Sequence, residues 1–98
     1  EFAKNIYWVY GIVLKESYPL SANDITKKLS QKGVGTRPFF WCLHEQPVLK
    51  KMGYNISEKF PVAENLARKG FYIPSGLAIT DIQIDYVSEM VIEVLNKL

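Results

Sequence analysis

The sequence predicts an α+β domain, in which helices pack on one face of a small, mostly antiparallel three-stranded sheet. Two observations favour this class. Short segments rich in aromatic and β-branched residues alternate with short segments of helical periodicity. The chain has 98 residues, of which 48% are hydrophobic, and this length allows one hydrophobic core but not two. We therefore expect one domain.

The first strand is expected over residues 5–14, because the run NIYWVYGIVL consists largely of residue types that suit a pleated surface. Both alternating sets of side chains are apolar, so each face of this strand should be covered. A helix should follow, starting with the capping pattern of Ser21 and Asp24 and ending at Gly33, which can adopt a left-handed conformation. Its buried side should carry three apolar residues at helical spacing: Ala22, Ile25 and Leu29.

The middle of the chain carries weaker patterns. Residues 36–41 (TRPFFW) predict a second strand, and Pro38 favours an edge position because it has no N–H to donate to a ladder. Residues 43–56 predict a surface excursion with one helical turn near residues 48–52.

A third helix is expected from Pro61, which suits the first helical turn, to Gly70. Residues 71–73 should then form a short third strand. Thr80 and Gln83 form a capping box, which predicts a last helix from residue 81 or 82 to the chain end. Its buried stripe should comprise Val87, Met90, Val91, Val94, Leu95 and Leu98. Its solvated side should carry the acids that recur every four residues: Asp81, Asp85, Glu89 and Glu93.

The charge and cysteine content argue against several classes of protein. Twelve basic and ten acidic residues give a net charge of +2 without a basic stripe, so the footprint of a nucleic-acid binder is weak. Cys42 is the single cysteine, which excludes an internal disulfide and leaves a structural zinc site without its thiolates. No apolar run is long enough to span a membrane, so we expect a soluble, cytoplasmic protein.

The sequence holds no self-sufficient catalytic motif: it has no glycine-rich phosphate loop, HExxH, GxSxG or paired CxxC. Cys42 and His44 could form a nucleophile and base, but a lone cysteine beside Trp41 and Leu43 is more typical of a small buried side chain. The aromatic residues could form a base-stacking platform, yet few cations flank them, and packing in the core or between domains is the favoured role. These residues are Trp8, Tyr10, Phe39, Phe40 and Trp41.

Residues 33–47 read GVGTRPFFWCLHEQP and contain the most specific pattern in the chain. This stretch resembles the sugar-nucleotide aminotransferases, the perosamine-synthase-like branch of the fold-type I pyridoxal-phosphate enzymes. That family has a Gly-Ile-Gly-Thr-Arg-like turn, then aromatic residues, then a His-x-Gln-Pro-like end. The matching residues here are Gly35, Thr36, Arg37, Phe39, Phe40, His44, Gln46 and Pro47.

Three further stretches agree with the family in the same order. The Tyr-Trp-x-Tyr strand is matched by residues 7–10, and the family's Phe-Pro-x-Ala-Glu motif resembles residues 60–64. Its Leu-Pro-Ser motif before a Thr-capped last helix resembles residues 73–75 and Thr80. Each motif is weak alone, but four in register over most of the chain make chance an improbable explanation.

The resemblance implies that residues 1–98 form the C-terminal small domain of an enzyme whose large, cofactor-binding domain is absent from this chain. The complete enzyme would use pyridoxal phosphate to move an amino group, usually from glutamate, to a keto sugar attached to a nucleotide. It would form a homodimer and would bind neither nucleic acid nor a membrane. The cofactor lysine would lie in the large domain, so the isolated chain should hold no cofactor, be inactive and tend to self-associate.

Three side chains are the candidates for contact with substrate. Arg37 carries a planar guanidinium that suits a carboxylate or diphosphate, and its alternative role is a surface ion pair or packing on Phe39. His44 could bind a sugar hydroxyl or phosphate oxygen, and its alternative role is a hydrogen bond to a backbone carbonyl. Tyr10 could reach the shared cleft. A competing hypothesis is a free-standing α+β module that binds a protein or a nucleic acid.

Overall fold

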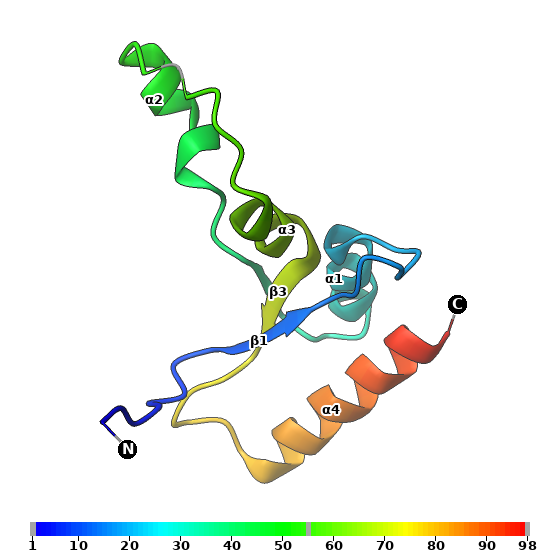
Figure 1. Ribbon diagram of the computed structural model, residues 1–98. Helices are drawn as coiled ribbons and strands as arrows, with labels where there is room; N and C mark the ends of the chain where they lie inside the picture. Colours follow the sequence, from blue (N-terminus) through cyan, green and yellow to red (C-terminus); the bar gives the residue numbers. More distant parts are fainter. Residues whose placement is uncertain (1, 55, 98) are drawn as a thin grey trace.

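The computed structural model describes residues 2–54 and 56–97, and it forms a three-stranded antiparallel sheet with helices (Figure 1). The sheet has the order β1-β3-β2 and consists of β1 (Tyr10–Val13), β2 (Arg37–Pro38) and β3 (Gly70–Ile73). The helical elements are α1 (Ala22–Gln31), a 3₁₀ turn (Leu43–Glu45), α2 (Pro47–Lys51), α3 (Pro61–Lys69) and α4 (Asp81–Asn96). The predicted α+β class is confirmed.

Local capping motifs fix where α1 and α4 begin. The Ser21 hydroxyl accepts a hydrogen bond from the Asp24 N–H at 3.1 Å, and the Asp24 carboxylate accepts one from the Ser21 N–H. Thr80 and Gln83 make the same reciprocal pair at 3.2 and 2.9 Å. Each pair satisfies backbone donors that the first helical turn leaves free. Both helix starts were therefore predicted correctly.

Replacing Thr80 by alanine should cost about 1 kcal/mol of stability, because the N–H of Gln83 would lose its acceptor at the start of α4. Urea unfolding measures this cost. The control is Ser88→Ala, because the Ser88 hydroxyl donates to the Ile84 carbonyl within α4 and caps nothing. Equal stabilities for the two variants would contradict a capping role for Thr80.

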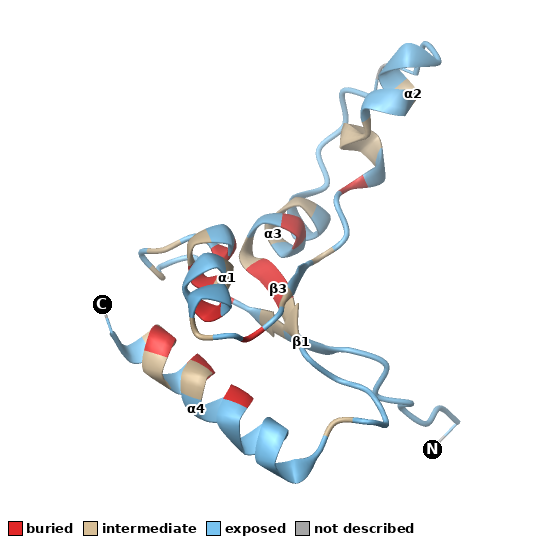
Figure 2. Ribbon diagram, turned by 180° about the vertical axis from the view of Figure 1, so that it is seen from behind, coloured by how far each residue is buried: buried red, intermediate tan, exposed pale blue. Residues whose placement is uncertain are grey.

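The core lies between β3, α1 and α4. Phe71 is fully buried and belongs to the same core cluster as the buried residues of both helices. Figure 2 shows buried segments in β3, α1 and α4. The core residues are Leu14, Ala22, Ile25, Leu29, Val34, Phe71, Val87, Val91 and Val94. The buried sides of α1 and α4 were thus predicted correctly, although Leu98 lies outside the described residues.

In the described part of the chain, no helix is both long enough and apolar enough to cross a membrane.

The other face of the sheet is covered by the ring of Phe39. This ring lies across Gly11 in β1 and Gly70 in β3, so closely that a methyl group on Gly11 would come within 2.8 Å of Cζ. Arg37, two residues earlier, lies on the same face because its pairing partner is Tyr72 rather than Phe71. The two glycines therefore allow an aromatic ring to approach the backbone directly.

Both early strands are shorter than predicted. The expected strand over residues 5–14 is paired only from Tyr10 to Val13, and Tyr7 has a positive φ of 53°. The cause is the partner: β3 has four residues and ends at Ile73, and the following Pro74 has no N–H to continue the ladder. Residues 2–11 are exposed, so the described residues leave most of the expected first strand uncovered. Cover of one face by another domain of a complete protein remains a prediction.

The second strand, expected over residues 36–41, is limited to Arg37–Pro38. It pairs with β3 alone, so its edge position was predicted correctly. Beyond Phe39, residues 40–54 and 56–60 leave the sheet as a projecting arm that carries α2 (Figure 1). The arm gives the chain a radius of gyration of 16.2 Å, against about 13 Å for a compact domain of this length. The expected excursion and its helical turn are thus both present.

Candidate functional site

A cluster of paired charges joins the base of the arm to α3. The Nε2 atom of His44 lies 2.9 Å from the carboxylate of Glu64. The guanidinium of Arg68 donates to both carboxylate oxygens of Glu45, at 2.8 and 3.0 Å. Each pair connects the 3₁₀ turn with α3, across 20 and 23 residues of sequence, so the cluster holds the arm in place.

Two aromatic contacts surround these pairs. The His44 ring is tilted against Phe60, with 4.8 Å between ring centroids. The Arg68 guanidinium lies 5.1 Å from the centre of the Trp41 ring, a cation–π geometry. With only 11% of its side chain exposed, His44 is the most enclosed member of the cluster.

The hydrogen bond to Glu64 orients the His44 ring. A carboxylate only accepts hydrogen bonds, so Nε2 carries the hydrogen and Nδ1 is left to contact another group. In the neutral ring Nδ1 accepts a hydrogen bond, and in the protonated ring it donates one. Glu64 thereby decides which nitrogen of His44 can meet a ligand.

The same contact lowers the pKa of Glu64 below its ordinary value of 4.5. The main cause is the hydrogen bond from His44, followed by one from the N–H of Phe60 at 3.3 Å. A carboxylate with a lowered pKa in the folded state stabilises that state above its ordinary pKa. This contribution is lost as the pH falls through the lowered value, so it disappears only in acid.

Glu64→Gln should therefore lower the free energy of unfolding near neutral pH and change it little in strong acid. The difference in unfolding free energy between this variant and the unsubstituted chain should shrink as the pH falls below 4.5. Denaturant unfolding over a pH series measures it, and Glu58→Gln, an exposed carboxylate in the same arm, is the control. A difference that persists unchanged into acid would contradict this assignment.

Arg37 lies exposed in β2, on the face of the sheet that Phe39 covers. Among residues 2–54 and 56–97, no carboxylate forms an ion pair with it. A free, exposed guanidinium can hold a carboxylate or phosphate through two parallel hydrogen bonds. Its surroundings are compatible with the substrate contact expected from the sequence, which remains a prediction.

Tyr10 lies on the opposite face of the sheet from Arg37. Tyr10 pairs with Ile73 in β3, whereas Arg37 pairs with Tyr72, and adjacent residues of one strand point to opposite faces. The Tyr10 side chain is 64% exposed and borders a groove between β1 and α4. The sheet therefore does not bring Tyr10 and Arg37 together.

Three potential metal ligands lie close together in the cluster. The ligand atoms of Cys42, His44 and Glu45 are within 4.8 Å of one another. However, Glu45 is held by Arg68 and His44 by Glu64, so a metal ion would have to displace two formed ion pairs. Cys42 itself is buried, which fits the small apolar role expected for it. We therefore interpret the residues as ion pairs that stabilise the fold rather than as a metal site.

The aromatic residues that the sequence singled out are spread over the surface. Trp8 and Phe40 stack at 6.2 Å, and both are exposed. Trp41 is 49% exposed beneath Arg68. The expected packing of these rings in the core is therefore wrong for this chain, since only Phe39 covers the sheet. Packing against another domain remains a prediction.

Sequence reasoning missed the acidic and basic partners of His44. Glu64 was noted only as part of a family-like motif, and Glu45 and Arg68 carried no signal at all. No local pattern could have found them, because the pairs join residues 20 and 23 positions apart.

The comparison with known proteins covers nearly the whole chain. A sequence model of the DegT/DnrJ/EryC1/StrS aminotransferase family matches residues 2–92. GDP-perosamine synthase from Escherichia coli O157:H7 is 26% identical over 87 residues, which are 89% of this chain and 22% of the relative. The putative pyridoxal phosphate-dependent aminotransferase EpsN from Bacillus subtilis (strain 168) is 28% identical over 90 residues, which are 91% of this chain and 23% of the relative.

A third relative carries a different activity in its name. GDP-4-keto-6-deoxy-D-mannose 3-dehydratase from Yersinia pseudotuberculosis is 28% identical over 75 residues, which are 74% of this chain and 19% of the relative. The chain thus spans about a quarter or less of the length of these proteins. The matched residues include every strand and the first three helices. The chain belongs to the DegT/DnrJ/EryC1/StrS aminotransferase family.

Proposed function

We propose that this chain is the C-terminal domain of a pyridoxal-phosphate-dependent enzyme that transfers an amino group from glutamate to a nucleotide-linked keto sugar. The observation that carries the proposal is the family match over residues 2–92. It is supported by relatives named GDP-perosamine synthase at 26% and 21% identity. The proposed role of the domain is to close one wall of the substrate cleft, where it excludes water and fixes the reacting groups.

The described residues do not fit a cofactor site of their own. A lysine that binds pyridoxal phosphate needs a desolvated pocket, and every lysine of this chain is exposed or half-buried. Lys32, one of the less exposed, is already paired with Glu93 at 3.0 Å. We therefore place the cofactor lysine in a preceding domain of a longer polypeptide, and no step of the reaction is assigned to a lysine of this chain.

Arg37 and His44 are the side chains proposed to contact substrate. Arg37 would hold the donor carboxylate or the diphosphate through two parallel hydrogen bonds. His44, oriented by Glu64, would present Nδ1 to a sugar hydroxyl or phosphate oxygen. Tyr10 faces the other side of the sheet, so it would meet a ligand only from the direction of the groove.

The proposal is tested with the complete polypeptide that carries this chain, incubated with isotope-labelled glutamate and a nucleotide-linked 4-keto sugar. Appearance of labelled nitrogen in the sugar is the expected result. The 98-residue chain alone, mixed with pyridoxal phosphate, should develop no absorbance from a lysine-bound cofactor. A complete polypeptide that binds the cofactor but leaves the sugar unlabelled would overturn the proposed reaction.

A second candidate reaction is dehydration of the keto sugar. It is favoured by one observation, the 28% identity to a relative named GDP-4-keto-6-deoxy-D-mannose 3-dehydratase. Mass spectrometry of the same incubation separates the two reactions, because dehydration removes water and amino transfer replaces a keto oxygen by nitrogen. Salt-dependent binding of single-stranded DNA or RNA, without either reaction, would instead favour a nucleic-acid-binding module.

A further inference from the structure

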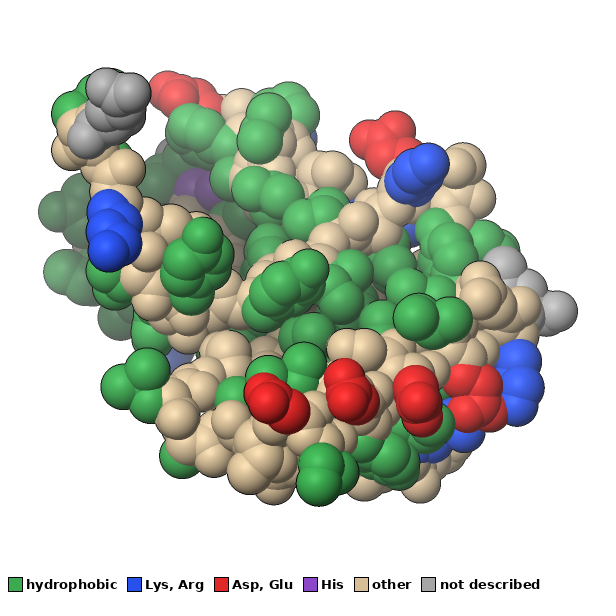
Figure 3. Space-filling view, turned by 90° about the horizontal axis from the view of Figure 1, so that it is seen from below, with side chains coloured by type: hydrophobic (Ala, Val, Ile, Leu, Met, Phe, Trp, Pro, Cys, Tyr) green, Lys and Arg blue, Asp and Glu red, His purple; other side chains and the backbone are tan. Residues whose placement is uncertain are grey.

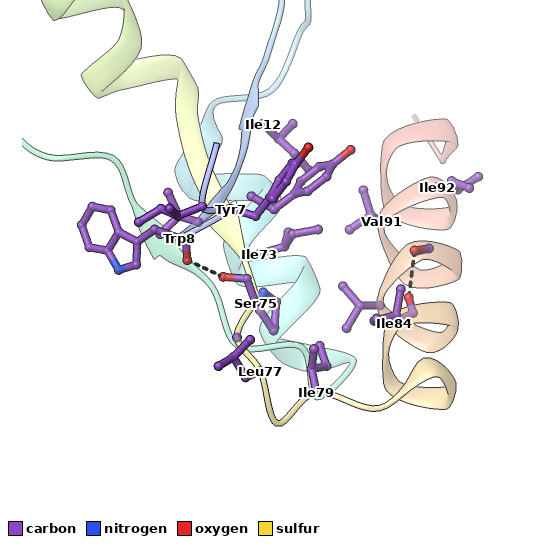
Figure 4. A pocket seen from close by; sticks show the side chains of 17 residues that line it. Tyr7, Trp8, Ile12, Ile73, Ser75, Leu77, Ile79, Ile84, Val91 and Ile92 are labelled. Carbon is purple, nitrogen blue, oxygen red and sulfur yellow. Dashed lines mark hydrogen bonds between the residues drawn. The ribbon is translucent and has the colours of Figure 1, made fainter. Parts of the chain in front are cut away.

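Tyr72 belongs to the central strand β3 and lies on the face of the sheet that is turned away from the core. Its neighbours in β3, Phe71 and Ile73, point to the other face, where Phe71 is buried in the core. Figure 4 shows Ile73 directed into the apolar groove beside α4. Because successive residues of a strand point to opposite faces, the Tyr72 side chain points away from both the core and the groove.

Arg37 is the cross-strand neighbour of Tyr72 on that face. The two residues are directly opposite each other in the pairing of β2 with β3. Directly opposite side chains of an antiparallel pair have their Cβ atoms about 5 Å apart. In β1 the residue opposite Tyr72 is Gly11, and the Phe39 ring takes the space above it. The open side of Tyr72 is therefore the side of Arg37.

The polar ends of both side chains have no partner in the described part of the chain. Arg37 forms no ion pair there, and no described group forms a hydrogen bond with the Tyr72 hydroxyl. Tyr18 and Tyr86, by contrast, donate to backbone carbonyls at 2.8 and 2.7 Å. A hydroxyl with a structural role has such a partner, so that of Tyr72 is left for a ligand.

Charge distinguishes the two faces of the sheet as sites for an anion. The groove is lined mainly by apolar residues, and α4 beside it carries exposed acids at a spacing of four residues. Figure 3 shows acidic side chains in a row next to apolar surface. This row comprises Asp81, Asp85 and Glu89. Such a row repels a carboxylate or phosphate, whereas Arg37 on the opposite face attracts it. Tyr10 borders the groove, so Tyr72 is the tyrosine that an anion bound to Arg37 can meet.

We infer that the Tyr72 hydroxyl donates a hydrogen bond to the same anionic group of the substrate that the Arg37 guanidinium holds. The inference rests on the proposed function, because it adds a second donor to the proposed substrate contact of Arg37. The guanidinium supplies two parallel hydrogen bonds from β2, and the phenol supplies a third from β3. Two strands of one sheet then fix the position of the anion, which orients the rest of the substrate. An anionic oxygen is the chemistry that the donor carboxylate and the diphosphate share.

The test measures binding of two probes by isothermal titration calorimetry to the complete polypeptide that carries this chain, loaded with pyridoxal phosphate. Inorganic pyrophosphate represents the diphosphate. Glutarate represents the donor carboxylate, because it lacks the amino group that would react with the cofactor. Tyr72→Phe should weaken the binding of one probe about tenfold, as expected for a lost hydrogen bond to a charged group. Arg37→Gln should weaken the binding of the same probe, and the two effects should be less than additive in the double variant.

Tyr54→Phe is the matched control, since Tyr54 is an exposed tyrosine on the arm, outside the sheet. This control should bind both probes as the unsubstituted polypeptide does. Tyr72→Phe keeps the aromatic ring and removes only the hydroxyl, so circular dichroism should show that the variant keeps the fold. A change in probe binding then reports the hydroxyl itself.

Three results would overturn the inference. The first is that Tyr72→Phe or Arg37→Gln binds both probes as tightly as the unsubstituted polypeptide. The second is that the two substitutions weaken different probes, and the third is that neither probe binds to the unsubstituted polypeptide. Probe binding does not depend on turnover. Weakened binding in both variants of a polypeptide that transfers no amino group would therefore overturn the proposed function alone.

Discussion

Gly70→Ala is expected to destabilise the domain by about 3 kcal/mol or more, a large share of the stability of a small domain. A methyl group at this position would lie 2.5 Å from the carbonyl oxygen of Leu66 and 2.7 Å from Cε2 of the Phe39 ring. That carbonyl accepts the N–H of Gly70 where α3 ends, so it cannot retreat without opening the junction of α3 and β3. Strand β3 is the centre of the sheet, so strain there reaches both edge strands.

Thermal or urea unfolding of Gly70→Ala, Gly11→Ala and Gly35→Ala tests this expectation. At Gly11 only the Phe39 ring is in the way, at 2.8 Å, and at Gly35 nothing lies within 4 Å. The loss of stability should therefore fall in the order Gly70, Gly11, Gly35. Adding Phe39→Leu should relieve much of the cost at Gly11 and little at Gly70, because the Leu66 carbonyl stays in place. Full relief at both positions would contradict this explanation.

Arg37→Gln should lower kcat/KM of the complete enzyme about 100-fold, if the proposed function holds. Removing the guanidinium takes away charge-assisted hydrogen bonds worth about 2–3 kcal/mol, and each 1.4 kcal/mol corresponds to about tenfold. Arg37→Lys should recover only part of the loss, because an ammonium group cannot bind a carboxylate or phosphate through two parallel bonds. The substrate whose kcat/KM falls most, glutamate or the sugar nucleotide, identifies the anion that Arg37 holds.

Lys28→Gln is the matched control, since Lys28 is an exposed cation in the last turn of α1. Circular dichroism should show that both variants keep the fold, because Arg37 forms no ion pair among residues 2–54 and 56–97. Unchanged kcat/KM for both substrates in Arg37→Gln would remove this residue from the substrate site.

The helices could be predicted from the sequence because their signals are local. Ser21 with Asp24, Thr80 with Gln83, and Gly33 each act within one turn, and the structure shows all of them in the expected roles. The strand lengths could not be predicted in the same way. The extent of β1 depends on a partner about 60 residues later, which Pro74 ends after four residues.

The sequence points to Arg37, His44 and Tyr10 only as individual residues, and their contact with substrate remains a prediction. The motif around Arg37 and His44 is visible in the sequence, and the family match over residues 2–92 agrees with it. The neighbours of Arg37 and His44 could not be predicted, because they come from distant segments of the chain, as Glu64 does for His44. The register of β3 with its two neighbours places Tyr10 and Arg37 on opposite faces, and such register is set by long-range packing.

The strand order β1-β3-β2 has a consequence for synthesis on the ribosome. The central strand is the last of the three to be made, so neither earlier strand can find a hydrogen-bonding partner until residue 73 has emerged. Helix α4, which closes the core, emerges later still. Nascent chains truncated before α4 would expose Phe71 and the apolar side of α1 and would be substrates for chaperones. This domain is therefore expected to fold only after its own translation is nearly complete.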